Sequence, residues 1–197
     1  MIGKSSDLQP RHWRELGRKV RNHQYDIDDN GVVVVAHARV SGVFKITTPA
    51  GAVTQSKNLW TTEGLNYLLS AGLGNGTRYP TFYIAPFSGN VTLSDTLTAA
   101  TFASTVTELT TQYTNPTRIE WIETVPADKN INNEANPQTL TTAVDSVTVW
   151  GLGLLSSSTK GSTAGVLIAA TKFPTAQVIP TAGGKISITY SATFSNI

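Results

Sequence analysis

The chain has 197 residues, of which 40% are hydrophobic and only 14% are charged. Soluble domains usually carry about a quarter charged residues, so Ser and Thr must supply much of the polar surface. The absence of cysteine excludes disulfides, thiolate metal sites and cysteine nucleophiles. No apolar run approaches the ~20 residues of a membrane-spanning helix. The first residues lead into charged ones, so we expect no secretion signal.

Residues 1–24 are strongly basic. They contain six Lys or Arg and two Asp or Glu, a net charge of +4, whereas residues 25–197 contain nine and eleven, a net charge of −2. Trp13, Leu16 and Val20 recur at the spacing of a narrow apolar helix face. Arginines at steps of three and four occupy a neighbouring face. We therefore divide the chain into a basic arm or helix, residues 1–24, and a β body, residues 25–197.

Three roles fit the basic arm: a solvated helix packed on the body, an anchor that docks on an acidic protein surface, or a contact with nucleic acid. Cationic side chains neutralise phosphates. However, only one aromatic residue interleaves and no nucleic-acid-binding motif follows, so nucleic acid is the least favoured partner. For the anchor, the candidate partner-binding residues are Arg11, Trp13, Arg14, Leu16, Arg18, Val20 and Arg21.

A calcium-loop pattern begins just after the arm. Asp26, Asp28, Asn30 and Gly31 match the first half of such a loop. The match fails at the twelfth position, where His37 stands in place of a bidentate Glu. Asn followed by Gly between β-rich segments is also a strong hairpin signal, because both residues tolerate positive φ. The segment therefore predicts a hairpin turn, and we expect neither a metal nor a cofactor.

Residues 185–194 alternate strictly between apolar and hydroxyl side chains. A period of two is typical of a half-buried β-strand. The side chains expected on the buried face are Ile186, Ile188, Tyr190, Ala192 and Phe194. Further strands are expected at residues 32–40, 43–48, 79–86, 118–123, 139–154 and 165–172.

One helix is expected within residues 58–72. Thr61 or Thr62 is its expected N-cap, Glu63 lies in the first turn, and Gly72 follows as the stop signal. The expected buried stripe of this helix consists of Leu65, Leu68 and Leu69.

The remaining segments are weakly patterned. Residues 87–116 are Thr-rich, with a long loop expected around 87–98, and residues 126–137 are expected to form a projecting loop. Short strands, turn signals and one helix predict a mainly β fold. We expect an antiparallel β-sandwich or jelly-roll-like domain with one short internal helix and the basic N-terminal arm.

The sequence offers no catalytic constellation. The three histidines lie in the first fifth of the chain, and no metalloprotease, nucleophile-elbow or P-loop spacing occurs. Glu120 and Glu123 are three residues apart, so on a strand they would face opposite sides and could not share acid–base work. We therefore expect a protein that is not an enzyme.

The tryptophans fit two interpretations. Trp60, Trp121 and Trp150 could form a platform on which sugar rings stack, or they could pack in the core. Each lies among apolar neighbours, which favours the core. Trp13 is the exception and is a candidate interface anchor.

Three segments resemble small structural proteins of tailed bacteriophages. They are residues 58–69 (NLWTTEGLNYLL), 83–88 (YIAPFS) and 156–161 (SSSTKG), together with the closing strand. The similarity covers roughly residues 25–197, and its motifs are structural rather than catalytic. Residues 1–24 lie outside it, so the resemblance implies nothing about them.

The resemblance implies a non-enzymatic virion component, assembled in the host cytoplasm. The favoured role is a capsid decoration or cement protein that binds the major capsid protein, or other virion proteins, through its arm. The alternatives are a tail, collar or fibre-base subunit and a carbohydrate-binding virion appendage. The hydroxyl face of residues 185–194 can meet a neighbour at little desolvation cost. We therefore expect a homo-oligomer, with a trimer favoured, and no membrane partner.

Overall fold

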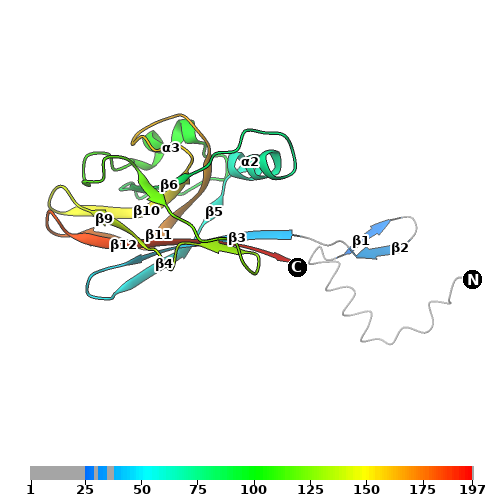
Figure 1. The fold of residues 1–197 in the computed structure, drawn as a ribbon, viewed down its shortest axis with the longest axis horizontal. Helices are drawn as coiled ribbons and strands as arrows, with labels where there is room; N and C mark the ends of the chain where they lie inside the picture. Colours follow the sequence, from blue (N-terminus) through cyan, green and yellow to red (C-terminus); the bar gives the residue numbers. More distant parts are fainter. Residues whose placement is uncertain (1–24, 29–30, 35–37, 197) are drawn as a thin grey trace, which may run out of the picture. The chain divides into compact units, whose positions relative to one another are not determined.

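The computed structural model describes residues 25–28, 31–34 and 38–196. The fold is mainly β, with two antiparallel sheets packed as a sandwich and two short helices in the described residues (Figure 1). This confirms the predicted sandwich. The larger compact unit spans Val40–Thr193, and a separate hairpin belongs to the smaller unit.

The first sheet has the strand order β4-β3-β12-β8, and β9 pairs with β12 beside β8. Its strands are β3 (Ala38–Thr47), β4 (Val53–Lys57), β8 (Asn130–Asn132), β9 (Gln138–Thr141) and β12 (Lys185–Asn196). The second sheet has the order β5-β11-β10-β6-β7. Its strands are β5 (Leu59–Trp60), β6 (Phe82–Phe87), β7 (Ile119–Trp121), β10 (Val147–Leu155) and β11 (Leu167–Ile179).

The alternating strand β12 is central in the first sheet. Its residues Ile186, Ile188, Tyr190 and Ala192 are buried, as predicted. Phe194 is 44% exposed, so the inward pattern stops at Ala192 and the expectation for Phe194 is wrong. The inward side chains pack against the second sheet; for example, the Tyr190 ring lies 5.3 Å from that of Trp121, between ring centroids.

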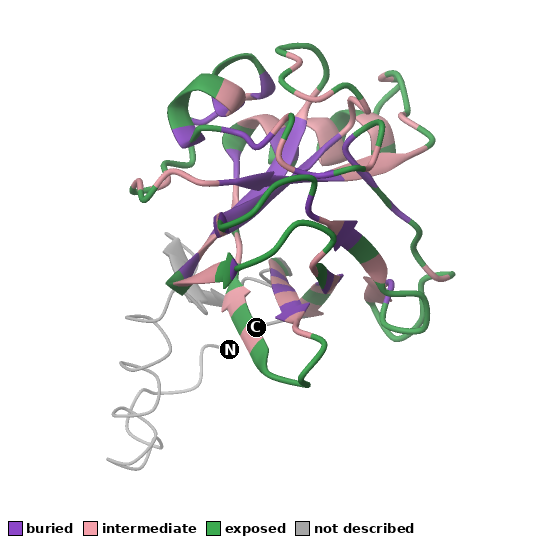
Figure 2. Cartoon of the chain, turned by 90° about the vertical axis from the view of Figure 1, so that its left-hand side faces the viewer, coloured by how far each residue is buried: buried purple, intermediate pink, exposed green. Residues whose placement is uncertain are grey.

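The second sheet is covered on both faces. One face meets the first sheet, and helices α2 (Thr62–Gly72) and α3 (Ala99–Val106) lie over the other (Figure 1). The last five residues of β10 are therefore all buried. Gly153 leaves room for the α3 ring of Phe102, because a Cβ there would lie 2.6 Å from it. Figure 2 shows the buried residues gathered in the strands and the exposed ones in the surrounding loops.

Helix α3 was not predicted, so the expectation of a single internal helix is wrong. The amide of Thr98 donates to Oγ1 of Thr101 at 3.2 Å, which closes the first turn. Ala99, Phe102 and Val106 are fully buried and recur at i, i+3 and i+7, the spacing of one helix face. The surrounding Thr-rich sequence masked this short pattern, because Thr is a poor helix former.

Residues 126–137, expected as a projecting loop, include strand β8. Asp128 and Lys129 both have positive φ, 49° and 61°, in the turn between the bridged residues Ala127 and Asn130. The returning strand pairs with β12. Hydrogen bonding to a central strand therefore orders a segment whose one large apolar side chain is Ile131.

The predicted hairpin after the arm is present. Strand β1 (Tyr25–Asp28) pairs antiparallel with β2 (Gly31–Val34), with Asp28 opposite Gly31.

Candidate functional site

The segment 58–69, which carries most of the resemblance, forms the crossing between the two sheets. Thr61 is the N-cap of α2, and its Oγ1 accepts a hydrogen bond from the amide of Gly64 at 2.9 Å. The same hydroxyl donates to the carbonyl of Leu167 at the start of β11. Thr61 therefore begins the helix and ties it to the sheet, and of the two predicted N-caps it is the correct one.

Glu63 joins three elements at this crossing. Its Oε2 accepts hydrogen bonds from the amides of Ala99 at 2.8 Å and Leu167 at 2.7 Å. Ala99 is the first residue of α3, so the carboxylate lies at a helix N-terminus, where negative charge is favourable. The sequence indicated only that Glu63 lies in the first turn of its own helix.

Gly64 allows α2 to approach the sheet closely. A Cβ at this position would collide with the carbonyl oxygen of Ile168 in β11. Asn58 and Tyr67 add polar contacts: Asn58 Nδ2 donates to the hydroxyl of Tyr190 at 3.0 Å, and the hydroxyl of Tyr67 accepts from the amide of Tyr79 at 2.9 Å. These residues of the segment are therefore used to build the fold.

The leucines of the segment are used differently. Leu65 and Leu69 were predicted to be buried, but they are 40% and 59% exposed, and Leu73 after them is 87% exposed. Only Leu68 of the predicted stripe is half-buried. The helix period was right and its phase was wrong, because α2 meets the sheet with Gly64 and Tyr67 instead. We call Leu65, Leu69 and Leu73 the leucine ridge.

A buried ion pair joins Glu108, which follows α3, to Arg118, which directly precedes β7. Arg118 is fully buried, and its guanidinium forms two bonds to the Glu108 carboxylate, Nε to Oε1 at 2.8 Å and Nη2 to Oε2 at 2.7 Å. It also donates to the carbonyls of Ser157 and Ser162, each at 3.1 Å. A buried charge pair needs such added hydrogen bonds to offset its desolvation. The pair therefore fixes the loop 156–165.

Lys160, within this loop, adds a second attachment by contacting Tyr113. Its Nζ donates to the carbonyl of Tyr113 at 3.0 Å and lies 3.6 Å from the centroid of that ring. Burial lowers the pKa of Lys160, and the charge of Glu108 opposes this shift. Burial, and then Glu108, raise the pKa of Tyr113 above its usual value. The two contacts of Lys160 with Tyr113 therefore hold the loop in place.

Neither partner of the ion pair was singled out from the sequence. Arg118 was expected only as the start of a strand, and Glu108 lies in the weakly patterned Thr-rich region. The one local sign of a buried pair is that Arg118 directly precedes the apolar Ile119. A charged residue at the start of a buried strand usually has a partner of opposite charge.

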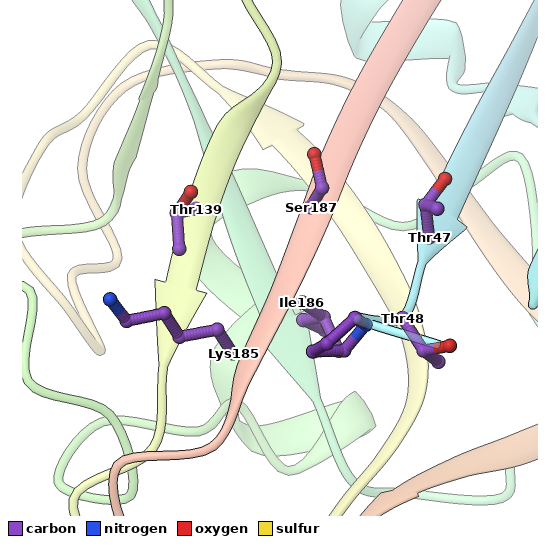
Figure 3. A pocket seen from close by; sticks show the side chains of 7 residues that line it. Thr47, Thr48, Thr139, Lys185, Ile186 and Ser187 are labelled. Carbon is purple, nitrogen blue, oxygen red and sulfur yellow. The ribbon is translucent and has the colours of Figure 1, made fainter. Parts of the chain in front are cut away.

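A shallow hollow of about 270 Å³ lies on the first sheet (Figure 3). It is lined by Thr47, Thr48, Pro49, Thr139, Lys185, Ile186 and Ser187. Figure 3 shows the Lys185 ammonium group pointing away from Thr47 and Thr48. The lining contains no acid, histidine or aromatic residue, and its charged group does not converge with its hydroxyls. The hollow therefore has no arrangement suited to catalysis.

The tryptophans of the body do not share a platform. Trp121 is buried and Trp60 packs against the same core cluster, which confirms the core interpretation for these two. Trp150 packs against a second apolar cluster, which includes Phe87 and Phe102. The ammonium of Lys172 lies 5.5 Å from the Trp150 ring centroid.

The two predicted strand carboxylates and the predicted arm have separate outcomes. Glu120 and Glu123 are both exposed, in line with a solvated role. The seven arm residues lie outside the described residues, as do His12, His23 and His37.

In the part of the chain that the structure describes, no group of three or more potential metal-ligating side chains occurs. Among the same residues, neither helix is long and apolar enough to cross a membrane.

Comparisons of the chain with protein-family models, with curated proteins and with solved structures found no match. The likeness of residues 58–69, 83–88 and 156–161 to phage structural proteins therefore stays a prediction. What the structure adds is a role for each segment: the first joins the two sheets, the second forms β6, and the third is the loop fixed by Arg118.

Proposed function

We propose that this chain is a non-enzymatic structural protein of a tailed-bacteriophage virion. The favoured role is a capsid decoration or cement protein attached through the basic arm, residues 1–24. Its partners are then the major capsid protein or other virion proteins, and it acts in the virion after assembly in the host cytoplasm. The resemblance of the three segments supports this proposal.

The observation that carries the proposal is how the body uses its side chains. The strongest charge cluster, Arg118 with Glu108, holds a loop, whereas the leucine ridge is left in contact with solvent. Exposed apolar side chains gathered on one element mark surfaces for protein contact. A body built in this way is suited to binding other proteins rather than to transforming a small molecule.

Homo-oligomerisation is part of the proposal, with a trimer favoured. On the hydroxyl face of β12, Thr189 is buried, and Ser187, Ser191 and Thr193 are half-buried. Uncharged hydroxyls of this kind can meet a neighbour at low desolvation cost. Light scattering of the full chain tests this. A monomer in solution that also contacts no copy of itself on the particle would contradict it.

The attachment role is tested by removing the arm. The body has its own core within Val40–Thr193, so a chain of residues 25–197 is expected to stay folded and to lose binding to particles. High salt should weaken binding of the full chain, because exposed ion pairs are screened. If the shortened chain binds particles as well as the full chain, the arm is not the anchor.

A further inference from the structure

We propose that a second hollow, which lies where β6 ends and β10 begins, binds a single sugar ring. Its volume is about 310 Å³, at the small end of the range for ligand pockets, ~300–1,000 Å³. The inference goes beyond the proposed function and does not depend on it, because a sugar site can serve a virion protein or any other. It rests on the apolar base of the hollow, on two fixed planar polar groups and on three hydroxyls.

The base of the hollow is apolar and its rim is open. The lining residues Leu109 and Val147 are only 4% and 3% exposed, whereas Val144 is 46% exposed. Asp145 and Ser146, which also line it, are exposed as well. A sugar ring presents C–H groups on its faces and hydroxyls around its edge. An apolar base bordered by a few polar groups therefore suits such a ring.

Two planar polar side chains border the hollow in fixed orientations. Oδ1 of Asp145 accepts a hydrogen bond from the amide of Ala182 at 2.7 Å. Oε1 of Gln112 accepts from the amides of Thr110 at 2.9 Å and Thr111 at 3.1 Å. These bonds leave the second carboxylate oxygen as an acceptor and the side-chain nitrogen of Gln112 as a donor. Side chains that are already ordered bind a ligand at a lower entropy cost.

Three hydroxyl side chains complete the lining, those of Ser88, Ser146 and Thr148. The amide of Ser88 donates to the carbonyl of Thr107, and that of Ser146 to the carbonyl of Pro180, each at 3.0 Å. The Ser88 hydroxyl donates to the same Thr107 carbonyl at 3.3 Å, which leaves it as an acceptor. Ser146 is held at a φ of 55°, which is uncommon for a residue other than glycine. The main chain therefore fixes where these serine side chains lie.

The charges of the lining select a neutral ligand. Asp145 is the one charged side chain among the residues that line the hollow, so an anion would be repelled. Asp145 and Gln112 lie on adjoining segments, since the Ala143 amide donates to the Gln112 carbonyl at 2.8 Å. A simple cation would pair with the carboxylate but leave the donor of Gln112 without an acceptor. Neighbouring sugar hydroxyls each donate and accept, so they satisfy both groups, and unpaired polar groups cost affinity.

Titration of the full chain with D-glucose, D-galactose, D-mannose and N-acetyl-D-glucosamine, followed by NMR, tests the site. An open hollow that covers one ring binds weakly, so we expect a saturable Kd of about 1–10 mM for at least one sugar. Asp145→Asn replaces the charged acceptor and should weaken this binding at least about tenfold, because hydrogen bonds to charged groups are the stronger ones.

Asp128→Asn is the matched control for this substitution. It makes the same chemical change at an exposed carboxylate in the turn before β8, so sugar binding should stay unchanged. Equal weakening in the two variants would overturn the inference, because binding would then depend on overall charge rather than on the hollow. Failure of all four sugars to give saturable binding would overturn it as well.

A second variant separates binding from folding. Ser146→Gly removes one hydroxyl and relieves the positive φ, since glycine adopts that conformation without strain. The thermal midpoint should be unchanged or slightly higher, while sugar binding should weaken by about threefold or more. Unchanged sugar binding would show that this turn does not touch the ligand and would overturn the site.

Two further probes identify the ligand chemistry and its source. Tighter binding of methylammonium than of any sugar, lost in Asp145→Asn, would show a cation site and overturn the sugar assignment. Methyl glycosides of the sugar that binds then distinguish a glycan chain from a free monosaccharide. A glycoside that binds as tightly as the free sugar supports the end of a glycan chain as the ligand, and a glycoside that does not bind assigns the hollow to free monosaccharides.

Discussion

Individual residues in the interior hold their positions through polar pairing as well as packing. Arg118 is fully buried, and its guanidinium is bonded to Glu108 and to two loop carbonyls. Removing one member of such a pair leaves an uncompensated charge, whereas replacing both by apolar residues can be nearly neutral. The pair is therefore expected to behave as a unit.

Arg118→Met is expected to lower the free energy of unfolding by about 3–5 kcal/mol, because Glu108 is left buried and unpaired. The double variant Arg118→Met with Glu108→Leu should recover most of this loss. Urea denaturation of the single and double variants measures both effects. A single variant as stable as the unchanged chain would mean that the pair is open to solvent.

Two buried tyrosines predict a loss of stability in alkali. Burial raises the pKa of Tyr113 and of Tyr190 above the ordinary value of 10.0; the bond from Asn58 partly opposes the shift at Tyr190. Both are protonated in the folded and the unfolded chain below about pH 10, so their contribution is fully present there. Above that pH the unfolded chain ionises first, and stability falls as pH rises.

Tyr113→Phe should reduce this alkaline loss. The Tyr113 hydroxyl is buried without a hydrogen-bond partner, so its removal should cost little stability at neutral pH. Denaturation midpoints between about pH 8 and pH 11 check this expectation. A variant whose stability falls as steeply with pH as that of the unchanged chain would contradict it.

At the scale of elements, the close approach of α2 to β11 depends on Gly64. A Cβ there would collide with a main-chain oxygen of β11, which cannot rotate away. Gly64→Ala is therefore expected to destabilise the fold by about 1–3 kcal/mol, as overpacking does. Gly72→Ala in the same helix is the control, because nothing lies within 4 Å of its Cβ position. The control should be neutral or slightly stabilising, since Gly costs helix stability.

Thermal denaturation of the two alanine variants makes the comparison. Equal midpoints for Gly64→Ala and Gly72→Ala would mean that α2 can move away from the sheet without cost, and the account of this crossing would be wrong.

The same helix marks how far the sequence could predict the elements. The N-cap of α2 and the helical period of its apolar residues could be predicted from the sequence. A cap depends on local residues, and the period follows from the geometry of the helix itself. The buried face of α2 could not be predicted, because that depends on which residue meets the sheet, and Gly64 meets it through main-chain contact. Strand β12 was predicted well since alternation reports directly on a sheet with one core face.

Contacts distant in sequence were the least predictable. Glu63 bonds to the amides of Ala99 and Leu167, and no local pattern reports a partner that far along the chain. Short elements such as β8 and α3 were also missed, since they depend on pairing with β12 or packing on β10 rather than on their own propensity. The candidate arm lies outside the described residues, so its role rests on the sequence alone.

At the scale of the whole molecule, the sandwich of the larger unit keeps its stabilising features apart from its exposed apolar and hydroxyl side chains. The core and the ion pair lie inside, and the leucine ridge and the half-buried hydroxyls of β12 lie on the surface of the larger unit. Such a body can present several weak contacts at once, and multivalent contacts on an assembly gain strength from effective concentration. This is the physical basis of the proposed role, in which the chain stabilises a particle through contacts.

The most direct measurement of the central claim is the copy number of this chain, by quantitative mass spectrometry, in purified particles of the tailed bacteriophage that we propose encodes it. The account predicts that the chain is a stoichiometric component, with a copy number comparable to that of the major capsid protein. A single small ring of copies would place it in the tail or collar and contradict the decoration role. Absence of the chain from purified particles, with the chain found only in the infected cell, would contradict the structural role altogether.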